Sequence, residues 1–301
     1  MNHEFPTVED AATAYEALTQ WYEHNARELP WRQGELTPWG VLVCEVMSQQ
    51  TPVARVAPIW TSWIHRWPTP HAMAQASPAE VLIAWDRLGY PRRALRLLEC
   101  AQEVVAHYDG HLPQERSELL SLPGIGQYTA DALLAFAFHQ YSVVLDTNIR
   151  RVLARWHGAA LPSAHPTAAD RTTAAQFVPH DGHKAALWNQ AIMEFGAVVC
   201  TAVRPQCTHC PVAELCGWRA RGFPQAASGT GPAPQKFIGT QREARGKIMR
   251  VLRSKLGSSF TRAQLLSASG LPEERFTPAL AALIHDGLAD ETRSGKLALP
   301  R

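Results

Sequence analysis

The sequence has no long hydrophobic run and no large excess of charge of either sign. No apolar stretch reaches the roughly 18 residues that a membrane helix needs, so we expect no membrane partner. The first ten residues lack the basic and apolar regions of a secretory signal, which predicts a soluble, cytoplasmic protein. The 29 Lys and Arg residues nearly balance the 27 Asp and Glu residues, so a strongly basic tail is excluded and only local basic patches are expected.

Cysteine is also scarce, but four of the six residues lie close together in the chain. Thiols this dense are joined by disulfides or hold a metal, and a reducing compartment favours a metal. Zinc sites usually have two short C-x2-C pairs, whereas the pattern here, C-x6-C-x2-C-x5-C, has one such pair flanked by single cysteines. The spacing therefore favours a [4Fe-4S] cluster over zinc, with accidental clustering as the third interpretation. The four residues are Cys200, Cys207, Cys210 and Cys216.

Alternation of polar and apolar residues is nearly missing before residue 285, which excludes a body rich in strands. Apolar residues recur instead at spacings of three and four, which is typical of helices with one face on a core. The sequence therefore predicts an all-α body, and 301 residues are enough for two or more units. The segments with this spacing are Ala11–Trp21, Val53–Trp67, Pro78–Leu88, Arg93–Tyr108, Asp131–Phe138 and Asn148–Trp156.

Several short motifs predict turns and helix starts. Thr51 and Ser77 each precede a proline, which predicts an N-cap followed by proline at the first helical position. Residues 122–126, Leu-Pro-Gly-Ile-Gly, separate a short helix over 117–122 from a helix that begins near Gln127. Gly124 and Gly126 can take positive φ, and the next helix N-terminus attracts anions, so this turn can hold a phosphate. Taken alone, such a motif is more often only a turn.

The C-terminal part of the chain has a different composition. Residues 223–241 begin with a stretch rich in Gly, Pro, Ala and Ser and are expected to form a linker. Residues 242–301 predict helices from near Arg242, over Arg262–Ser267 and over Glu273–His285, and then a hairpin that turns at Ser294-Gly295. This order predicts a small winged-helix-like domain. The first of these helices is strongly basic, which fits DNA binding and equally fits a helical dimerisation module with a solvated charged face.

The motifs occur together in an order that resembles a known family. The turn at 122–126 and its helix, residues 143–148 and the four cysteines resemble the helix-hairpin-helix superfamily of DNA glycosylases with its Gly-Pro-Asp region. The N-terminal half is similar to adenine DNA glycosylases of the MutY type. The resemblance runs from about residue 29 to residue 216. Its other matching pieces are Leu29-Pro30-Trp31-Arg32, Glu45-Val46-Met47-Ser48-Gln49-Gln50-Thr51, Leu88-Gly89-Tyr90 and Asn189-Gln190.

This resemblance implies a catalytic set of Glu45, Asp146, Tyr128 and Asn148. Glu45 is the only acid among apolar neighbours in residues 41–47, and burial there would raise its pKa so that it can protonate the adenine ring. Asp146, as an anion, would stabilise the cationic sugar that forms when the base departs. From the residues alone, a surface glutamate and a helix N-cap are the commoner interpretations of these two acids.

Tyr128 separates two branches of the superfamily that the chain resembles. In the endonuclease III type, the matching position holds a lysine that forms a Schiff base and cuts the strand. Tyr128 offers no amine nucleophile, so the resemblance implies a monofunctional enzyme that uses water and leaves an abasic site. Packing of Tyr128 in the pocket wall is compatible with that role.

The resemblance also implies a set of DNA contacts. Extrusion of a base costs a few kcal/mol and needs side chains that fill the gap in the duplex. Gln49, Gln50 and Tyr90 would fill it, although core packing is an alternative for Tyr90 and for Trp31. Arg92 and Arg93 are expected to contact phosphates or to be solvated. The full expected set is Trp31, Arg32 and Gln190 at the adenine pocket, with Gln49, Gln50, Thr51, Tyr90, Arg92, Gly124, Ile125, Gly126 and Arg204 on the DNA.

The expected organisation and partners follow from the same resemblance. We expect a glycosylase domain over 8–222, in which residues 31–139 form a six-helix subdomain and 8–30 join 140–222 around the cluster loop. The partner would be double-stranded DNA with a mismatch, bound by a monomer that associates with the nucleoid if the source is bacterial. The family usually carries a Nudix-like domain that helps recognise 8-oxoguanine, and this chain is too short for one. Adenine opposite 8-oxoguanine or guanine is the first expectation, with a T:G thymine glycosylase or a non-catalytic DNA-binding protein as alternatives.

Overall fold

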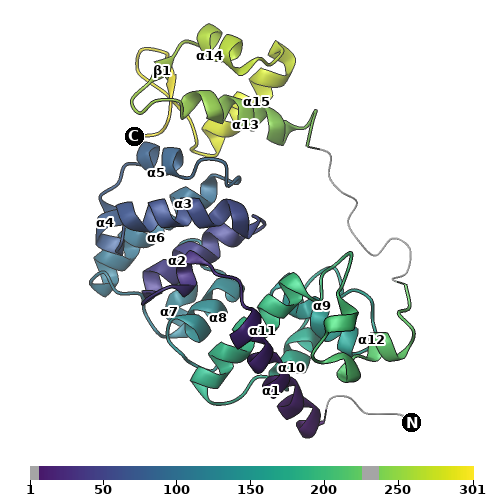
Figure 1. Cartoon of the computed structure of the whole chain (residues 1–301). Helices are drawn as coiled ribbons and strands as arrows, with labels where there is room; N and C mark the ends of the chain where they lie inside the picture. The colour runs from purple at the N-terminus through teal and green to yellow at the C-terminus, as the bar shows by residue number, and fades with distance from the viewer. Residues whose placement is uncertain (1–6, 226–236) are drawn as a thin grey trace. The chain divides into compact units, whose positions relative to one another are not determined.

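The computed structural model describes residues 7–225 and 237–301 (Figure 1), and the expected linker at 223–241 therefore lies partly outside the described residues. Helices dominate the described chain, which confirms the all-α body. The helices up to residue 225 are α1 Val8–Asn25, η1 Pro30–Arg32, α2 Pro38–Ser48, α3 Val53–Arg66, α4 Pro70–Ala74, α5 Pro78–Ala84, α6 Arg92–Tyr108, α7 Arg116–Ser121, α8 Gln127–Phe136, α9 Thr147–Trp156, α10 Ala168–Ala175, α11 Gly182–Val198, η2 Cys207–His209, η3 Ala213–Leu215 and α12 Gly217–Ala220.

The chain divides into two compact units, each built from two separate stretches of sequence. The first unit joins residues 1–38 to 126–233, and the second joins 39–125 to 234–301. Helix α8 packs against α11, which places residues 126–138 with the cysteine-bearing stretch, whereas the sequence grouped them with the stretch that begins at residue 31.

Helix α11 lies at the centre of the first unit, with α1, α8 and α9 packed around it (Figure 1). Its Trp188 is fully buried and stacks on Phe177, with ring centroids 6.1 Å apart. Trp156 and Tyr15 approach the same indole from other helices. Large aromatic side chains bury much apolar area at small entropic cost, so this cluster fixes the helices that carry the candidate site.

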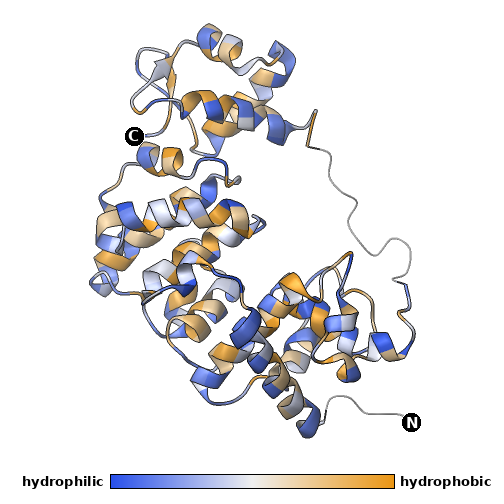
Figure 2. Cartoon of the chain, viewed as in Figure 1, coloured by the Kyte–Doolittle hydropathy of each residue, from blue (hydrophilic) through white to orange (hydrophobic). Residues whose placement is uncertain are grey.

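Tryptophan also organises the core of residues 39–125. Trp63 makes edge contacts with both Trp67 and Trp85, with centroids 4.7 and 5.6 Å apart. The indole of Trp39 donates to the Trp67 carbonyl, and that of Trp60 donates to the Gly40 carbonyl. These hydrogen bonds satisfy polar groups that burial would otherwise leave unpaired. Blue and orange residues alternate along the helices in Figure 2, as expected for helices with one face on a core.

The two predicted helix starts have different outcomes. Ser77 caps α5 with a complete capping box, since its hydroxyl accepts from the Glu80 amide and Glu80 accepts from the Ser77 amide. The N-cap predicted at Thr51 is wrong, because Pro52 occupies that position in α3. The Thr51 hydroxyl donates instead to the carbonyl of Leu88, 3.1 Å away. A tertiary hydrogen bond has taken the place of the local cap.

The glycine turn has the expected position but not the expected conformation at both glycines. It lies between α7 and α8, and Gly124 has φ of +80°. Gly126 has φ of −99° and is the extended N-cap of α8, so the expectation of positive φ there is wrong. A Cβ at Gly124 would lie 3.0 Å from the Cβ of Arg96. Close approach and a left-handed backbone both require glycine at this position.

Residues 237–301 fold as the winged-helix-like segment that the sequence predicts. Strand β1 follows the first of three helices, and β2 and β3 follow the third. The strands form an antiparallel sheet of order β1-β3-β2, in which Ala298 of the central strand pairs with both Ser259 and Asp290. Strand β1 was not predicted, because it pairs with the distant strand β3 and no hairpin turn such as Ser294-Gly295 marks it in the sequence. The elements are α13 Gln241–Leu252, β1 Ser259–Phe260, α14 Arg262–Ser269, α15 Glu273–His285, β2 Asp290–Glu291 and β3 Leu297–Ala298. No described helix is long and apolar enough to cross a membrane.

Candidate functional site

Glu45 lies on α2, a helix whose apolar side chains form much of the local core. Its neighbours Cys44 and Val46 are buried, and Glu45 itself is half-buried. The carboxyl group is therefore partly removed from water in an apolar environment, which is the condition for a raised pKa. The raised pKa of Glu45 stays a prediction.

The expected intercalating residues lie on two turns with strained backbones. Gln50 follows the end of α2 and has φ of +53°, while Tyr90 precedes α6 and has φ of +47°. A bulky residue in the left-handed region is uncommon and marks a backbone that other contacts hold in place. Tyr90 is 47% exposed, so core packing does not account for its side chain. The Gln50 side chain is exposed, and the Tyr90 hydroxyl accepts a hydrogen bond from Arg242 at 3.0 Å.

A cleft of about 130 Å³ adjoins these turns within the second unit. It is lined by apolar side chains of α2 and α6, by Gln49, and by Pro123, Gly124 and Ile125 of the glycine turn. Arginines of α6 form the rest of its lining: Arg92, Arg93 and Arg96. Sequence motifs far apart in the chain thus meet at one surface, which carries positive charge.

Arg93 is a residue whose place the sequence did not reveal. It was expected to contact phosphate or solvent, but its guanidinium points inward and donates to main-chain carbonyls of both turns, among them Gln49 and Gly89. Thr51, expected on the DNA, is buried and also bonds to the second turn through the Leu88 carbonyl. Arg92 is more exposed and forms an ion pair with Asp286 at 3.3 Å.

In the first unit, Asp146 is the N-cap of α9, as the sequence allowed. Its carboxylate accepts from the Ile149 amide and from the side-chain amide of Asn148, both at 2.6 Å. Burial raises the pKa of Asp146 above its ordinary value, while these donors oppose the rise. The cap thus fixes the orientation of a carboxylate in a site where ionisation is costly.

A chain of hydrogen bonds connects Asp146 to the cysteine loop. Arg151 donates to the side-chain carbonyl of Asn148 at 2.8 Å and, through Nε, to the backbone carbonyl of Cys200 at 2.8 Å. The same guanidinium reaches the carbonyl of Gly196 at 2.6 Å. Arg151 is buried and charged, so its bonds are strong and directional. Asn148 and Arg151 therefore link the candidate catalytic acid to a candidate metal ligand.

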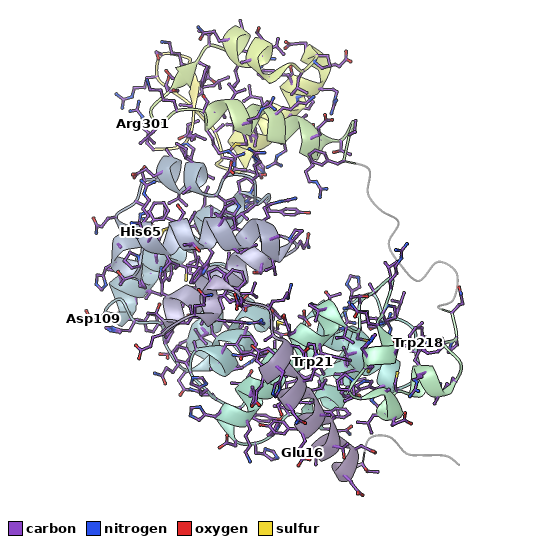
Figure 3. All side chains as sticks on the ribbon, in the orientation of Figure 1. Glu16, Trp21, His65, Asp109, Trp218 and Arg301 are labelled. Carbon is purple, nitrogen blue, oxygen red and sulfur yellow. The ribbon has the colours of Figure 1, made fainter. Side chains whose placement is uncertain are left out.

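The cysteine loop is organised by a second buried arginine. Arg155 donates to the Cys200 sulfur at 3.2 Å and to the Thr201 carbonyl at 2.8 Å. Its guanidinium also lies 4.6 Å from the ring centroid of Trp218, which Figure 3 labels. An arginine that is 3% exposed needs acceptors, and a thiolate is one. Sequence reasoning missed both arginines because the carbonyls that they reach at Gly196 and Cys200 are 45 residues away in the chain.

The four thiols lie within electrostatic reach of one another. Burial, together with the charges of Cys200, Cys207 and Cys216, raises the pKa of Cys210 to about 11, although a backbone hydrogen bond from Val212 opposes the rise. Bound iron would favour the thiolates and release the protons. Among the described residues, no three His, Cys, Asp or Glu side chains converge on a point where a single ion would bind. The soft, fourfold thiol donor set fits an iron–sulfur cluster.

Trp31, Arg32 and Gln190 lie near a buried acid that was not predicted. Arg32 bonds to Glu194 at 3.0 Å, and the Tyr22 hydroxyl donates to Gln190 at 3.4 Å. Trp31 is half-buried beside Arg32 in η1. The Arg32 guanidinium also lies 5.3 Å from the Tyr22 ring centroid. The expected pocket residues Arg32 and Gln190 are therefore connected through Tyr22.

Glu194 anchors this group through its ion pairs. Arg27 donates to Glu194 at 2.6 and 2.8 Å, a two-pronged pair. Burial would raise the pKa of Glu194, but the hydrogen bonds from Arg27 and Arg32 outweigh it and lower the pKa to about 2.

The remaining expected residues are placed as follows. Tyr128 is half-buried on the first turn of α8 and packs on the core of the first unit; its place in a pocket wall stays a prediction. Arg204 is exposed in the cysteine loop, next to Val203, which is 88% exposed. An arginine that projects from a loop can contact the phosphate backbone of DNA, and an apolar side chain beside it can contact the bases.

Two family models match this chain. Residues 43–175 match the HhH-GPD superfamily of base excision DNA repair proteins. Residues 200–216 match the iron–sulfur binding domain of endonuclease III, which supports an iron–sulfur cluster in this stretch of the chain.

Similar proteins match over most of the chain. The adenine DNA glycosylase of Mycolicibacterium smegmatis is 46% identical over 283 residues, which are 94% of this chain and 94% of that protein. Among solved structures, a thermostable thymine-DNA glycosylase is 26% identical, with a TM-score of 0.64 over 71% of this chain and 98% of its own. An endonuclease III–DNA complex, 23% identical with a TM-score of 0.61 over 72% of this chain and 99% of its own, shares the fold.

Proposed function

Because this chain belongs to the adenine DNA glycosylase family of helix-hairpin-helix base excision repair proteins, we propose that it removes adenine mispaired with 8-oxoguanine or guanine and leaves an abasic site. The observation that carries the proposal is 46% identity to a relative named for this activity, over nearly the full length of both chains. The contacts described above support the role proposed for each site residue.

Glu45 would act as the general acid. The bond between the sugar and adenine breaks with its electron pair leaving on the base, so a proton delivered to the ring makes adenine a better leaving group. A half-buried carboxyl on an apolar helix suits this role because burial favours its protonated form.

Asp146 would act as the fixed anion. Loss of adenine leaves positive charge on the sugar, and a preorganised carboxylate lowers the energy of that cation. The amides of Ile149 and Asn148 hold the carboxylate in one orientation and favour its ionised form against burial. Water then adds to the sugar carbon, and the product is an abasic site.

Tyr128 supports hydrolysis without strand cleavage. A lyase needs an amine that forms a covalent bond with the sugar, and the residue on this turn of α8 is a phenol packed on the core. The strand is therefore expected to stay intact until alkali or another enzyme cuts it.

The remaining residues would bind the duplex and the cluster. Gln49, Gln50 and Tyr90 would enter the stack, Arg204 and the turn at 124–126 would contact phosphates, and Arg32 with Gln190 would line the base pocket. We infer a [4Fe-4S] cluster, because four separate thiolates provide one ligand for each iron. The cluster's part is structural: it ties the loop that carries Arg204 to the rest of its unit.

A duplex panel tests the proposal. Purified protein is incubated with duplexes that contain A:8-oxoguanine, A:G or T:G, and the products are heated with alkali. We expect cleavage at both adenine mispairs and none before alkali, with Glu45→Gln inactive but still bound to DNA. Cleavage at T:G alone would favour a thymine glycosylase, the second candidate, which the fold similarity to a thymine-DNA glycosylase supports. Strand scission without alkali would contradict the role of Tyr128.

A further inference from the structure

Arg93 joins two turns that are separated by about forty residues of chain. One terminal nitrogen of its guanidinium donates to the carbonyls of Val46 and Gln49, each at 2.7 Å. The other terminal nitrogen donates to the carbonyls of Leu88 and Gly89, at 3.4 and 3.2 Å. One side chain thus fixes the end of α2 against the start of α6.

Both turns that Arg93 joins contain a residue with a left-handed backbone. Gln50 and Tyr90 both have positive φ, and so does Gly89 between the Leu88 carbonyl and Tyr90. A left-handed backbone is unfavourable for a residue with a Cβ, because the Cβ approaches the following carbonyl oxygen too closely. Such a conformation persists only when surrounding contacts determine it. The hydrogen bonds of Arg93 to the residues just before Gln50 and Tyr90 provide these contacts.

The chemistry of the guanidinium suits this position. Burial lowers the pKa of Arg93 to about 10, so the group stays charged at neutral pH and its hydrogen bonds are charge-assisted. The planar fork serves two turns at once, which a lysine ammonium on a flexible stem cannot reproduce. The guanidinium also lies 5.3 Å from the ring of Trp85 and 5.5 Å from the ring of Tyr90. Tyr90 is therefore held by its side chain as well as by its backbone.

We propose that Arg93 is a positioning residue, which holds the Gln49–Gln50 turn and the Leu88–Tyr90 turn in one fixed arrangement so that both enter the duplex together. The proposal rests on the proposed function, because it assumes that these turns fill the gap left by the extruded adenine. Arg93 touches neither the base nor the sugar. It acts on extrusion of the base and leaves the breaking of the glycosidic bond to the acids.

Loss of Arg93 would affect extrusion through both turns. Without the guanidinium, several carbonyls lose their charged donor, and the left-handed residues are free to relax to ordinary conformations. Each wedge would then fill the gap less often. Because extrusion costs a few kcal/mol, a loss of preorganised wedges lowers the population of the extruded state and slows excision in proportion.

The experiment compares Arg93→Met with Arg93→Lys and with a matched control, Arg87→Met. Arg87 lies in the same turn, and its side chain is 87% exposed with a distant contact to Asp86 at 3.8 Å. Single-turnover excision is measured on an A:8-oxoguanine duplex. A 2-aminopurine placed beside the target adenine reports unstacking, in Glu45→Gln and in Glu45→Gln combined with each variant, so that no chemistry disturbs the signal.

We expect Arg93→Met to lower the excision rate at least tenfold and to remove most of the 2-aminopurine rise, with Arg93→Lys intermediate and Arg87→Met unchanged. The melting temperature of each variant shows whether it folds, and Arg93→Lys carries the test if Arg93→Met does not. A full 2-aminopurine rise with a reduced rate, or an unchanged rate, would overturn the proposal. Failure of the proposed function is distinct, since wild-type protein would then not cleave the adenine duplex at all.

Discussion

At the scale of single residues, the orientation and ionisation of a candidate acid such as Asp146 depend on the side chains around it. Asp146 could be recognised in the sequence as a helix cap, and it is one. The link from Asn148 through Arg151 to the Cys200 carbonyl could not be recognised, because the packing of α9 on α11 brings that carbonyl to Arg151. The left-handed backbones of Gln50 and Tyr90 were equally hidden, because the contacts that hold them come from distant parts of the chain.

The pH dependence of excision follows from Asp146. Burial raises its pKa above the ordinary 3.8, and the proposed reaction needs the anion, so the rate falls as the pH drops through this raised pKa. Asn148→Ala removes a donor at 2.6 Å that favours the anion, and we expect the acid limb of the pH–rate profile to move to higher pH. Single-turnover rates between pH 4 and 8 measure it. An acid limb at the same pH in both proteins would contradict this assignment.

Arg151 should affect both the acid and the cluster loop. Arg151→Leu leaves the Asn148 side chain and the Cys200 carbonyl without a charged donor, so we expect an excision rate lower by about ten- to a hundredfold, since loss of a buried charge-assisted bond costs about 1.5–3 kcal/mol. Arg204→Leu is the matched control, because it removes an exposed arginine that is proposed to contact DNA and has no proposed role at Asp146. It should weaken DNA binding and leave the single-turnover rate at saturating protein largely unchanged.

At the scale of secondary-structure elements, the ion pairs of Glu194 hold η1 and the chain before it on α11. The sequence predicted α11 residues at the pocket but not this carboxylate, because Arg27 and Arg32 are more than 160 residues away in the chain. Long-range pairs leave no local pattern. The helix start at Ser77 could be predicted from the sequence because its capping partners, Ser77 and Glu80, are only three residues apart.

Glu194→Gln should destabilise the protein in a pH-dependent way. The pKa of Glu194 falls from 4.5 to about 2, which corresponds to on the order of 3 kcal/mol of stability from ionisation. A lowered pKa means that this stability is present above pH 4.5 and is lost as the pH falls toward 2. Urea unfolding at pH 7 and at pH 3 measures the difference between wild type and variant. We expect the difference to shrink at pH 3, and a constant difference would contradict the ion-pair account.

The cysteine loop is the element most dependent on a cofactor. Cys210→Ser removes one of four ligands, and we expect loss of the broad absorbance near roughly 400 nm that iron–sulfur proteins show. The loop at 200–216 should then become accessible to protease, because its order comes from metal ligation. Cys100→Ala is the control: this thiol is buried on α6, away from the loop in sequence, and the absorbance should be retained.

At the scale of the whole molecule, the sequence predicted the class of fold but not the division into units. The spacing of apolar residues and the capping residues predicted most helices and the winged-helix-like segment, because these signals are local. The grouping of residues 1–38 with 126–233 depends on which helices bury one another's faces. The apolar stripe of α1 fits many partners, and its sequence does not identify α11 as the one it meets.

Because each unit has its own hydrophobic core, we expect a substitution in one core to destabilise that unit alone. Leu18 is fully buried in the first unit and Leu82 in the second. Replacement of a buried leucine by alanine costs about 2–5 kcal/mol, so Leu18→Ala and Leu82→Ala should each lower the unfolding temperature of their own unit. Calorimetry with hydrogen exchange identifies which amides lose protection. Equal loss of protection in both units from one substitution would show that they unfold as one.

The packing of α1 on α11 has a consequence for synthesis on the ribosome. Helix α1 is made early and its binding site on α11 is made more than 150 residues later, so Ala14 and Leu18 stay uncovered while most of the polypeptide is still being translated. The nascent chain therefore exposes the apolar face of this early helix, which a chaperone can bind until the later helix emerges.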